Sequence, residues 1–203
     1  MPKVSKDYSE AQRQLILRAA VRCFAKTGFH RSTMRDVIRE SGMSAGALYL
    51  YFKSKDELIE AIAESRHQRE RLRISSALNQ ENLSSGLHAL VRSFADVLMD
   101  RGEEQERRLN VQLWAEALLD PKIYESVLSG VKVPAKLLKN RLEAAQEQGE
   151  VPDGLDCGAA ARVLVALYQG LALQAAWEPN LSLKPQLKVI EQMLTALAST
   201  ERG

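Results

Sequence analysis

Hydroxyl, phenol and ammonium groups gather in one short stretch of the chain, TMRDVIRESGMSAGALYLYFKSK. Thr33 and Ser44 carry oxygens that can accept hydrogen bonds from the free backbone N–H groups at a helix start. Tyr49 and Tyr51 add phenols, and Lys55 adds an ammonium group. The chain contains no HExxH motif, paired CxxC, phosphate-cradling glycine loop or nucleophile elbow. The chemistry of this stretch is therefore hydrogen bonding and charge pairing, which serve binding rather than catalysis.

Two short helices joined by a glycine turn must position these groups. Thr33 and Asp36 have the spacing of a capping box at the start of the first helix. Gly42 can adopt the left-handed conformation that ends a helix, because it has no Cβ to clash. Leu48 and Phe52, four residues apart, form the inward stripe of the second helix. Residues 33–52 thus have the outline of a helix-turn-helix.

Further capping signals extend this unit in both directions. Ser54 and Glu57 have the spacing of a capping box for a longer helix, and Ser9 and Gln12 have the same spacing upstream. The upstream helix should end near Gly28. We expect the resulting helices to share one small core.

The segment AxxCFAKTGFHRSTMRDVIRESGMSAGALYLYFKSKDEL resembles the DNA-binding domain of tetracycline-repressor (TetR/AcrR) type transcriptional regulators, over residues 9–66. The resemblance implies that five residues contact DNA phosphates: Thr33, Ser44, Tyr49, Tyr51 and Lys55. It also implies that Arg35 lies where a side chain can read bases. The alternative for each residue is local, since the hydroxyls can serve only as caps and the tyrosines only in packing.

The groove-facing positions of the second short helix carry little hydrogen-bonding capacity. Ala45, Ala47 and Leu50 can neither donate nor accept through their side chains. Gly46 permits close backbone approach, and Arg35 could grip guanine O6 and N7. We therefore expect sparse direct reading of bases, apolar contact with thymine methyl groups, and specificity that comes partly from DNA shape.

Charge is distributed unevenly along the chain. Residues 1–55 hold 11 Lys and Arg against 4 Asp and Glu, whereas residues 56–203 hold 17 against 22. The basic segment coincides with the proposed DNA-binding unit, although a solvated basic face explains the same bias. We expect residues 1–7, with Lys3 and Lys6, to form a disordered arm that adds phosphate contacts.

Helical periodicity dominates beyond residue 66, and strand-like alternation is absent. The sequence predicts an all-α protein with an arm and helix-turn-helix domain over residues 1–54. A larger helical regulatory and dimerisation domain follows over residues 55–203, entered by a connector helix whose arginines should be solvated. Asp120 and Pro121 should open a long helix in which Pro134 demands a kink or break that could line a cavity.

The resemblance implies a homodimer in which the last two helices of each subunit form a four-helix bundle. A two-fold dimer would place two recognition helices in successive major grooves of a pseudo-palindromic operator. Ordinary monomer core would explain the same apolar stripes. The candidate interface residues are Ala160, Val163, Leu164, Leu167, Leu171, Leu187, Ile190 and Leu194.

Regulators of this type usually hold a small effector in the C-terminal domain. A mostly apolar pocket with few polar groups would favour a hydrophobic or aromatic effector over a sugar or a metal. Core packing is the competing explanation for the aromatic candidates. The candidate lining residues are Gln112, Trp114, Tyr124, Tyr168 and Gln174.

Other functional classes are weaker alternatives. A helical enzyme that processes small molecules lacks its motifs, and a helical interaction module would leave the capped helix pair unexplained. No cofactor or metal is expected, and Cys23 and Cys157 should be reduced thiols. No apolar run approaches the roughly 20 residues of a membrane span and no secretory signal is seen. We therefore expect a bacterial-type cytoplasmic protein that associates with the nucleoid when it binds DNA.

Overall fold

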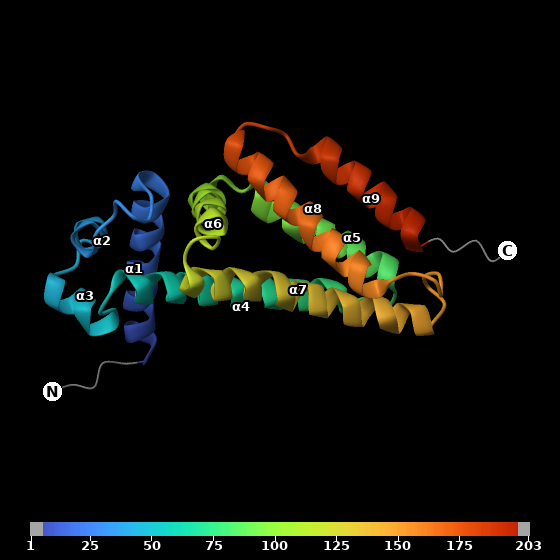
Figure 1. Cartoon of the computed structure of the whole chain (residues 1–203), viewed down its shortest axis with the longest axis horizontal. Helices are drawn as coiled ribbons and strands as arrows, with labels where there is room; N and C mark the ends of the chain where they lie inside the picture. Colours follow the sequence, from blue (N-terminus) through green and yellow to red (C-terminus); the bar gives the residue numbers. More distant parts are fainter. Residues whose placement is uncertain (1–5, 199–203) are drawn as a thin grey trace.

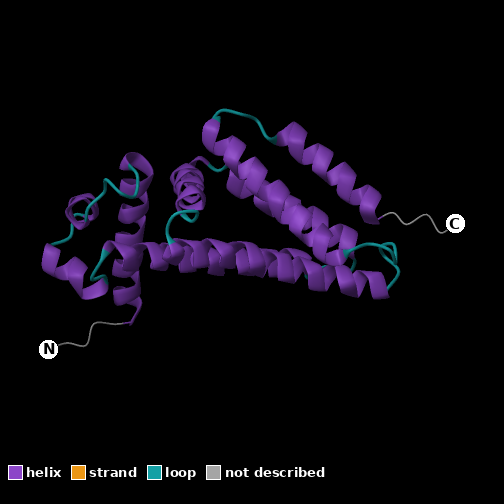
Figure 2. Cartoon of the chain, in the orientation of Figure 1, coloured by secondary structure: helices purple, strands orange, loops and turns teal. Residues whose placement is uncertain are grey.

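The computed structural model describes residues 6–198, and all regular secondary structure within them is helical, as predicted (Figure 1, Figure 2). The helices are α1 (Lys6–Thr27), α2 (Met34–Ser41), α3 (Ala45–Tyr51), α4 (Lys55–Leu78), α5 (Leu83–Met99), η1 (Arg101–Glu103), α6 (Glu104–Glu116), α7 (Pro121–Glu147), α8 (Cys157–Trp177) and α9 (Lys184–Ala198).

The helices form two groups that are bridged by long elements (Figure 1). Helices α1, α2 and α3 cluster at the amino-terminal end, and α5, α8 and α9 pack at the other end. Helix α4 leaves the first group and runs alongside α7 into the second. Helix α6 lies between the groups and contacts both α1 and α8.

The amino-terminal core is larger than the first three helices. Its buried centre includes Phe24, Val37 and Leu48, all without solvent exposure. Residues from outside the helix-turn-helix complete this core: Leu58, Ile59 and Ile62 of α4, Leu109, Leu113 and Ala117 of α6, and Ile123 of α7. The domain boundary proposed at residue 54 therefore does not coincide with the edge of the first core. Side chains of α4 and α6, which follow that boundary in the chain, are part of this core.

The carboxy-terminal core is built mainly from aliphatic side chains of α4, α5, α7, α8 and α9. Leu83, Leu87 and Leu142 are among its fully buried members. Helix α4 contributes Ile74, Ala77 and Leu78 to this second core, so one continuous helix belongs to both.

Two local predictions require correction. Helix α1 begins at Lys6, so Lys6 and Asp7 are helical rather than part of an arm, and residues 1–5 lie outside the described residues. Helix α7 opens at the predicted Asp120 cap but runs without a break across Pro134. Pro134 is buried and lines an internal cavity, and packing on the neighbouring helices offsets the hydrogen bond that proline removes from the helix.

Helix α8 also departs from the sequence expectation about membranes. Among the described helices it alone is long and apolar enough, by length and composition, to cross a bilayer. A helix that is apolar on every side can equally be buried on one face by its own chain and on the other by a second subunit.

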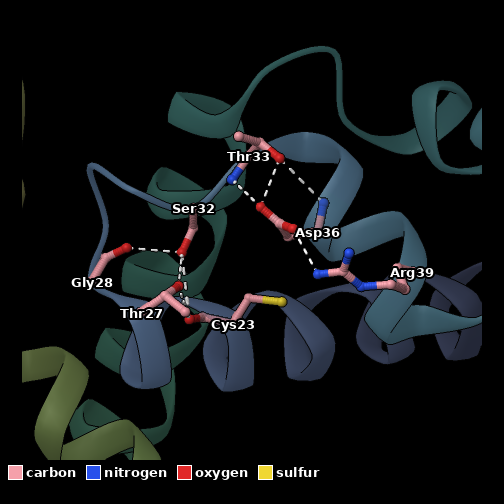
Figure 3. A network of polar contacts seen from close by, with 7 residues as sticks. All are labelled: Cys23, Thr27, Gly28, Ser32, Thr33, Asp36 and Arg39. Atoms are coloured by element: carbon pink, nitrogen blue, oxygen red, sulfur yellow. Dashed lines mark hydrogen bonds and ion pairs between the residues drawn. The ribbon is translucent and has the colours of Figure 1, made fainter.

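A compact polar network fixes the turn between α1 and α2 (Figure 3). Ser32 is buried, and its hydroxyl donates to the Gly28 carbonyl at 2.8 Å. The Ser32 and Thr27 hydroxyls are 2.6 Å apart, and Thr27 donates to the Cys23 carbonyl at 2.9 Å. These bonds connect the last turn of α1 to the residue that precedes the Thr33 cap. The network therefore sets where α2 begins relative to α1.

Replacing Ser32 with alanine should lower the free energy of unfolding by about 1 to 3 kcal/mol, because it removes the hydrogen bonds that the buried Ser32 hydroxyl forms with the Gly28 carbonyl and the Thr27 hydroxyl. Urea denaturation followed by circular dichroism measures this change. Ser76→Ala, at an exposed serine of α4, is the matched control and should change stability by less than about 0.5 kcal/mol. Equal stability of the two variants would show that the network does not hold the turn.

Candidate nucleic-acid interface and internal cavity

The turn between α2 and α3 has the geometry that the sequence predicts. Gly42 adopts the left-handed conformation with φ 68°, and the Ser44 hydroxyl accepts a hydrogen bond from the Ala47 N–H at 3.2 Å. Leu48 and Phe52 are buried on the inner side of α3. The outer side of the helix is consequently turned to solvent.

The exposed face of α3 is almost free of hydrogen-bonding groups. Leu50 is 86% exposed and Tyr49 is 45% exposed. Ala45 and Gly46 are also exposed, and a Cβ at Gly46 would meet nothing within 4 Å. An aliphatic side chain so fully hydrated gains free energy when a partner covers it. This face suits apolar contact and close backbone approach rather than a set of polar contacts.

The N–H and the hydroxyl of Thr33 are both occupied by hydrogen bonds at the start of α2 (Figure 3). Its N–H and hydroxyl both donate to Asp36 Oδ2, at 2.9 and 2.7 Å, and its oxygen accepts from the Asp36 N–H at 3.3 Å. These hydrogen bonds from Thr33, with the Arg39 guanidinium 2.7 Å from Oδ1, lower the pKa of the Asp36 carboxyl. Thr33 thus acts as a cap in this structure, and Arg35 beside it is exposed.

Lys55 is turned partly inward. Its ammonium donates to the carbonyls of Phe29 at 2.9 Å and Ser32 at 3.2 Å, and lies 4.2 Å from the centroid of the Phe29 ring. An ammonium has three donors, so one remains for a further acceptor. Tyr51 is half-buried against the amino-terminal core. Tyr49 and Leu50 are therefore exposed on α3, whereas Tyr51 and Lys55 are partly buried.

An apolar cavity lies inside the second helical group. It has a volume of about 50 Å³ and is lined by side chains of α4, α5, α7, α8 and α9, including Leu87, Leu138 and Pro134. Tyr168 lines the cavity, with its ring centroid 4.3 Å from that of Phe94. Burial, and then the neighbouring Glu70 carboxyl, raise the pKa of Tyr168 to about 12.

Of the five predicted effector residues, only Tyr168 is found on this cavity wall. Gln112 has a buried Oε1 without a hydrogen-bond partner, and Trp114 packs half-buried against the second core. Tyr124 and Gln174 are exposed. Helical periodicity alone could not distinguish these positions, because the aromatic stripes also fit ordinary core packing. That Tyr168 binds an effector stays a prediction.

Several predicted interface residues lie inside the subunit and must be corrected. Leu171, Leu187 and Leu194 are buried, and all three line the cavity. Leu164, Leu167 and Ile190 line it as well. Ala160 is half-buried against the core, whereas Val163 is 57% exposed. A side chain already buried by its own chain cannot be the surface that a second subunit covers, which excludes Leu171, Leu187 and Leu194. For the half-buried Ala160, Leu164, Leu167 and Ile190 and the exposed Val163, a place in the interface stays a prediction.

Glu70 and Arg107 are buried charged residues that sequence reasoning missed. Glu70 occupies the buried stripe of α4, four residues before Ile74, and such an interruption of an apolar stripe is the signal that could have identified it. Arg107 reaches back to α5, where its Nη1 donates to the carbonyls of Val97 and Asp100, both at 2.8 Å. No sequence pattern indicates that contact. Within residues 6–198, no group of His, Cys, Asp or Glu residues could hold a metal ion.

Comparisons with known proteins agree with this architecture. The family model described as "Bacterial regulatory proteins, tetR family" matches residues 16–62, and the model described as "BetI-type transcriptional repressor, C-terminal" matches residues 86–199. The two matches cover the helix-turn-helix and most of the second helical group.

Individual relatives are also transcriptional regulators. The chain is 35% identical over 124 residues to the uncharacterized HTH-type regulator YfiR of Bacillus subtilis, a match covering 53% of this chain and 60% of YfiR. It is 27% identical over 167 residues to the HTH-type regulator UidR of Escherichia coli K12, covering 80% of this chain and 82% of UidR.

Among solved structures, Salmonella enterica GusR superposes with a TM-score of 0.78 at 31% identity, covering 97% of this chain and 98% of GusR. SmeT, solved as a complex with triclosan, superposes with a TM-score of 0.78 at 25% identity, covering 95% of this chain and 93% of SmeT. The family models, the relatives and the exposed recognition helix agree. This chain belongs to the tetR family of bacterial regulatory proteins and is a helix-turn-helix transcriptional regulator of the ligand-responsive repressor type.

Proposed function

We propose that this regulator binds a pseudo-palindromic operator as a homodimer and is released by a small, mostly apolar effector that enters the internal cavity. The observation that carries the DNA-binding part is the outer face of α3, where Leu50 is 86% exposed beside Tyr49. Thr33, Arg35, Ser44, Ala45, Gly46, Tyr51 and Lys55 are the other proposed contacts. Family membership implies a cytoplasmic location, and we propose association with the nucleoid when DNA is bound.

The proposed contacts divide into positioning and reading. Backbone N–H groups at the starts of α2 and α3 carry partial positive charge and suit phosphates. The third donor of the Lys55 ammonium, which the carbonyls of Phe29 and Ser32 leave unused, would also bind a phosphate. Leu50 would contact a thymine methyl group, and Arg35 would bind guanine in the major groove. With so few direct readers, DNA shape supplies the remaining specificity.

The proposed dimer interface is the outer faces of α8 and α9. Val163, Trp177, Val189 and Met193 are large apolar residues exposed on these helices. At Gly170, a Cβ would meet nothing within 4 Å, which leaves room for a second helix to approach. Covering these side chains would remove apolar surface from water. A two-fold dimer formed in this way would place the recognition helices roughly 34 to 36 Å apart or farther.

Helix α4 is the proposed route from effector to DNA. It supplies Glu70 and Ile74 to the cavity wall, and Leu58 and Ile59 to the amino-terminal core. The cavity of about 50 Å³ is far smaller than the roughly 300 to 1,000 Å³ of typical ligand pockets. An effector must therefore push the cavity walls apart, and a displaced α4 would carry the helix-turn-helix with it and change the spacing of the two recognition helices.

The experiment that tests this function is selection of bound duplexes from random or genomic DNA by the purified protein. We expect recovered sites with two-fold symmetry, bound with a strong preference over unrelated duplex at the same salt concentration. Binding without any sequence preference would contradict the proposal and favour a helical interaction module with incidental DNA affinity.

Arg35→Ala should weaken binding to the selected site by about 1 to 3 kcal/mol for each half-site and relax the preference at one base pair, because a bidentate contact with guanine is lost. Fluorescence anisotropy with single-base variants of the site measures both effects. Arg92→Ala, at an exposed arginine of α5, is the control and should leave the affinity unchanged. An equal loss on every sequence would make Arg35 a phosphate contact instead.

Val163→Arg should raise the dimer dissociation constant by about a hundredfold or more, because each subunit would bury an unpaired charge in the interface. Analytical ultracentrifugation measures this change, and operator affinity should fall with it. Leu72→Arg introduces the same charge at a residue of α4 that is 60% exposed and should leave the dimer intact. A Val163→Arg protein that remains dimeric would exclude this face of α8.

A further inference from the structure

A small polar chamber adjoins the apolar cavity at its α4 side. The arginine chamber, as we call it, is lined by Arg66, Arg69, Arg73 and Arg107 and has a volume of about 30 Å³. Glu70 and Tyr168 line both the chamber and the apolar cavity. A single molecule could therefore extend from one space into the other past these two side chains.

Arg107 is the buried centre of the chamber wall. It is 7% exposed, and its Nη1 is the one atom with a hydrogen bond to the described residues, namely to the carbonyls of Val97 and Asp100. Its Nε is buried without a hydrogen-bond partner, and no carboxylate of the described residues forms an ion pair with it. A buried guanidinium without a counter-ion carries a large desolvation cost. The missing group is a hydrogen-bond acceptor, preferably a negatively charged one.

The remaining charges leave the chamber with an excess of positive charge. Arg66 is 3.8 Å from Glu70, and Arg69 is 2.5 Å from Glu106. Glu103 is the third acidic residue of the wall, so four guanidinium groups face three carboxyl groups. Burial raises the pKa of both Glu70 and Glu103.

The chemistry of the two spaces differs sharply. The apolar cavity is walled by leucine, isoleucine and valine side chains with the rings of Phe94 and Tyr168, and it suits a hydrocarbon or aromatic body. The arginine chamber offers charged donors, including the unpaired Nε of Arg107. Arg73 also forms no ion pair within 4.0 Å in the described part of the chain, so two guanidinium groups are available to a ligand.

We propose that the effector is an amphipathic acid, whose apolar body fills the cavity and whose anionic group binds Arg107 and Arg73 in the arginine chamber. This inference rests on the proposed function, in which the cavity is the effector site. A neutral apolar molecule would leave the Arg107 Nε–H unsatisfied. An organic cation would be attracted by Glu70 but repelled by the larger number of guanidinium groups.

Three probes with the same hydrocarbon body test the proposal by calorimetric titration of the purified full chain: octanoate, octanamide and octylammonium. Octanoate should bind about ten- to a hundredfold more tightly than octanamide, which is the range expected for hydrogen bonds to charged groups. Octylammonium should bind most weakly. Octanoate should also release the protein from its selected DNA site, whereas octanamide should do so only at higher concentration.

Two substitutions locate the anionic group. Arg107→Lys keeps a positive charge but lacks the Nε–H, and Arg73→Gln removes a charge from a side chain that has no ion pair to lose. Each should reduce the preference for octanoate over octanamide by about tenfold, while octanamide affinity stays the same. Arg71→Gln is the matched control on the same helix, because Arg71 pairs with Glu64 outside the chamber.

The outcomes separate this inference from the proposed function. If octanoate and octanamide bind equally well and both release DNA, the cavity remains the proposed effector site, but the inference that the effector is an acid is wrong. Three other results would also contradict the inference that the effector is an acid. The protein could prefer octylammonium, or its preference for octanoate could survive both substitutions. It could also fail to bind octanoate while it still binds its DNA site. Failure to select any symmetric DNA site would instead overturn the proposed function, whatever the probes do.

Discussion

The packing of helix α4 into two separate cores is the constraint on which the rest of the molecule depends. Its first turns bury Leu58, Ile59 and Ile62 with the helix-turn-helix, and its last turns bury Ile74, Ala77 and Leu78 among the regulatory helices. A helix is stiff over this length because each residue adds a backbone hydrogen bond to the previous turn. Movement at one end must therefore appear at the other, unless one of the two cores gives way.

Helix α6 adds a second connection between the same two regions. Leu109 and Leu113 belong to the amino-terminal core, while Arg107 on the same helix lies in the wall of the arginine chamber. The His30 ring lies 2.7 Å from the Glu116 carboxylate at the carboxy-terminal end of α6, which joins this helix to the loop that precedes α2. Helix α6 thus connects the arginine chamber directly to the DNA-binding unit, although the chamber lies in the regulatory domain.

The two proposed functional sites have opposite electrostatic character. The outer face of α3 carries no charge on Ala45, Gly46, Tyr49 or Leu50 and leaves attraction of DNA to its surroundings, where basic residues outnumber acidic ones. In the chamber, charge is buried, where it is costly unless it is paired. Arg107 is such a residue, because its guanidinium is buried and no carboxylate among the described residues pairs with it.

The sequence by itself determined the features that depend on neighbouring residues. The caps at Thr33, Ser44 and Asp120 and the left-handed Gly42 were all predictable, because a cap is a contact between residues two or three positions apart. Only the tertiary structure decided which apolar face of α8 points inward, since both faces carry aliphatic residues and periodicity cannot rank them. Leu171 faces the cavity and Val163 faces solvent for that reason. The burial of Arg107 and the inward orientation of Lys55 could also be seen only in the tertiary structure. Their partners are backbone carbonyls of other segments, and because every residue has such a carbonyl, no residue type in the sequence indicates the contact.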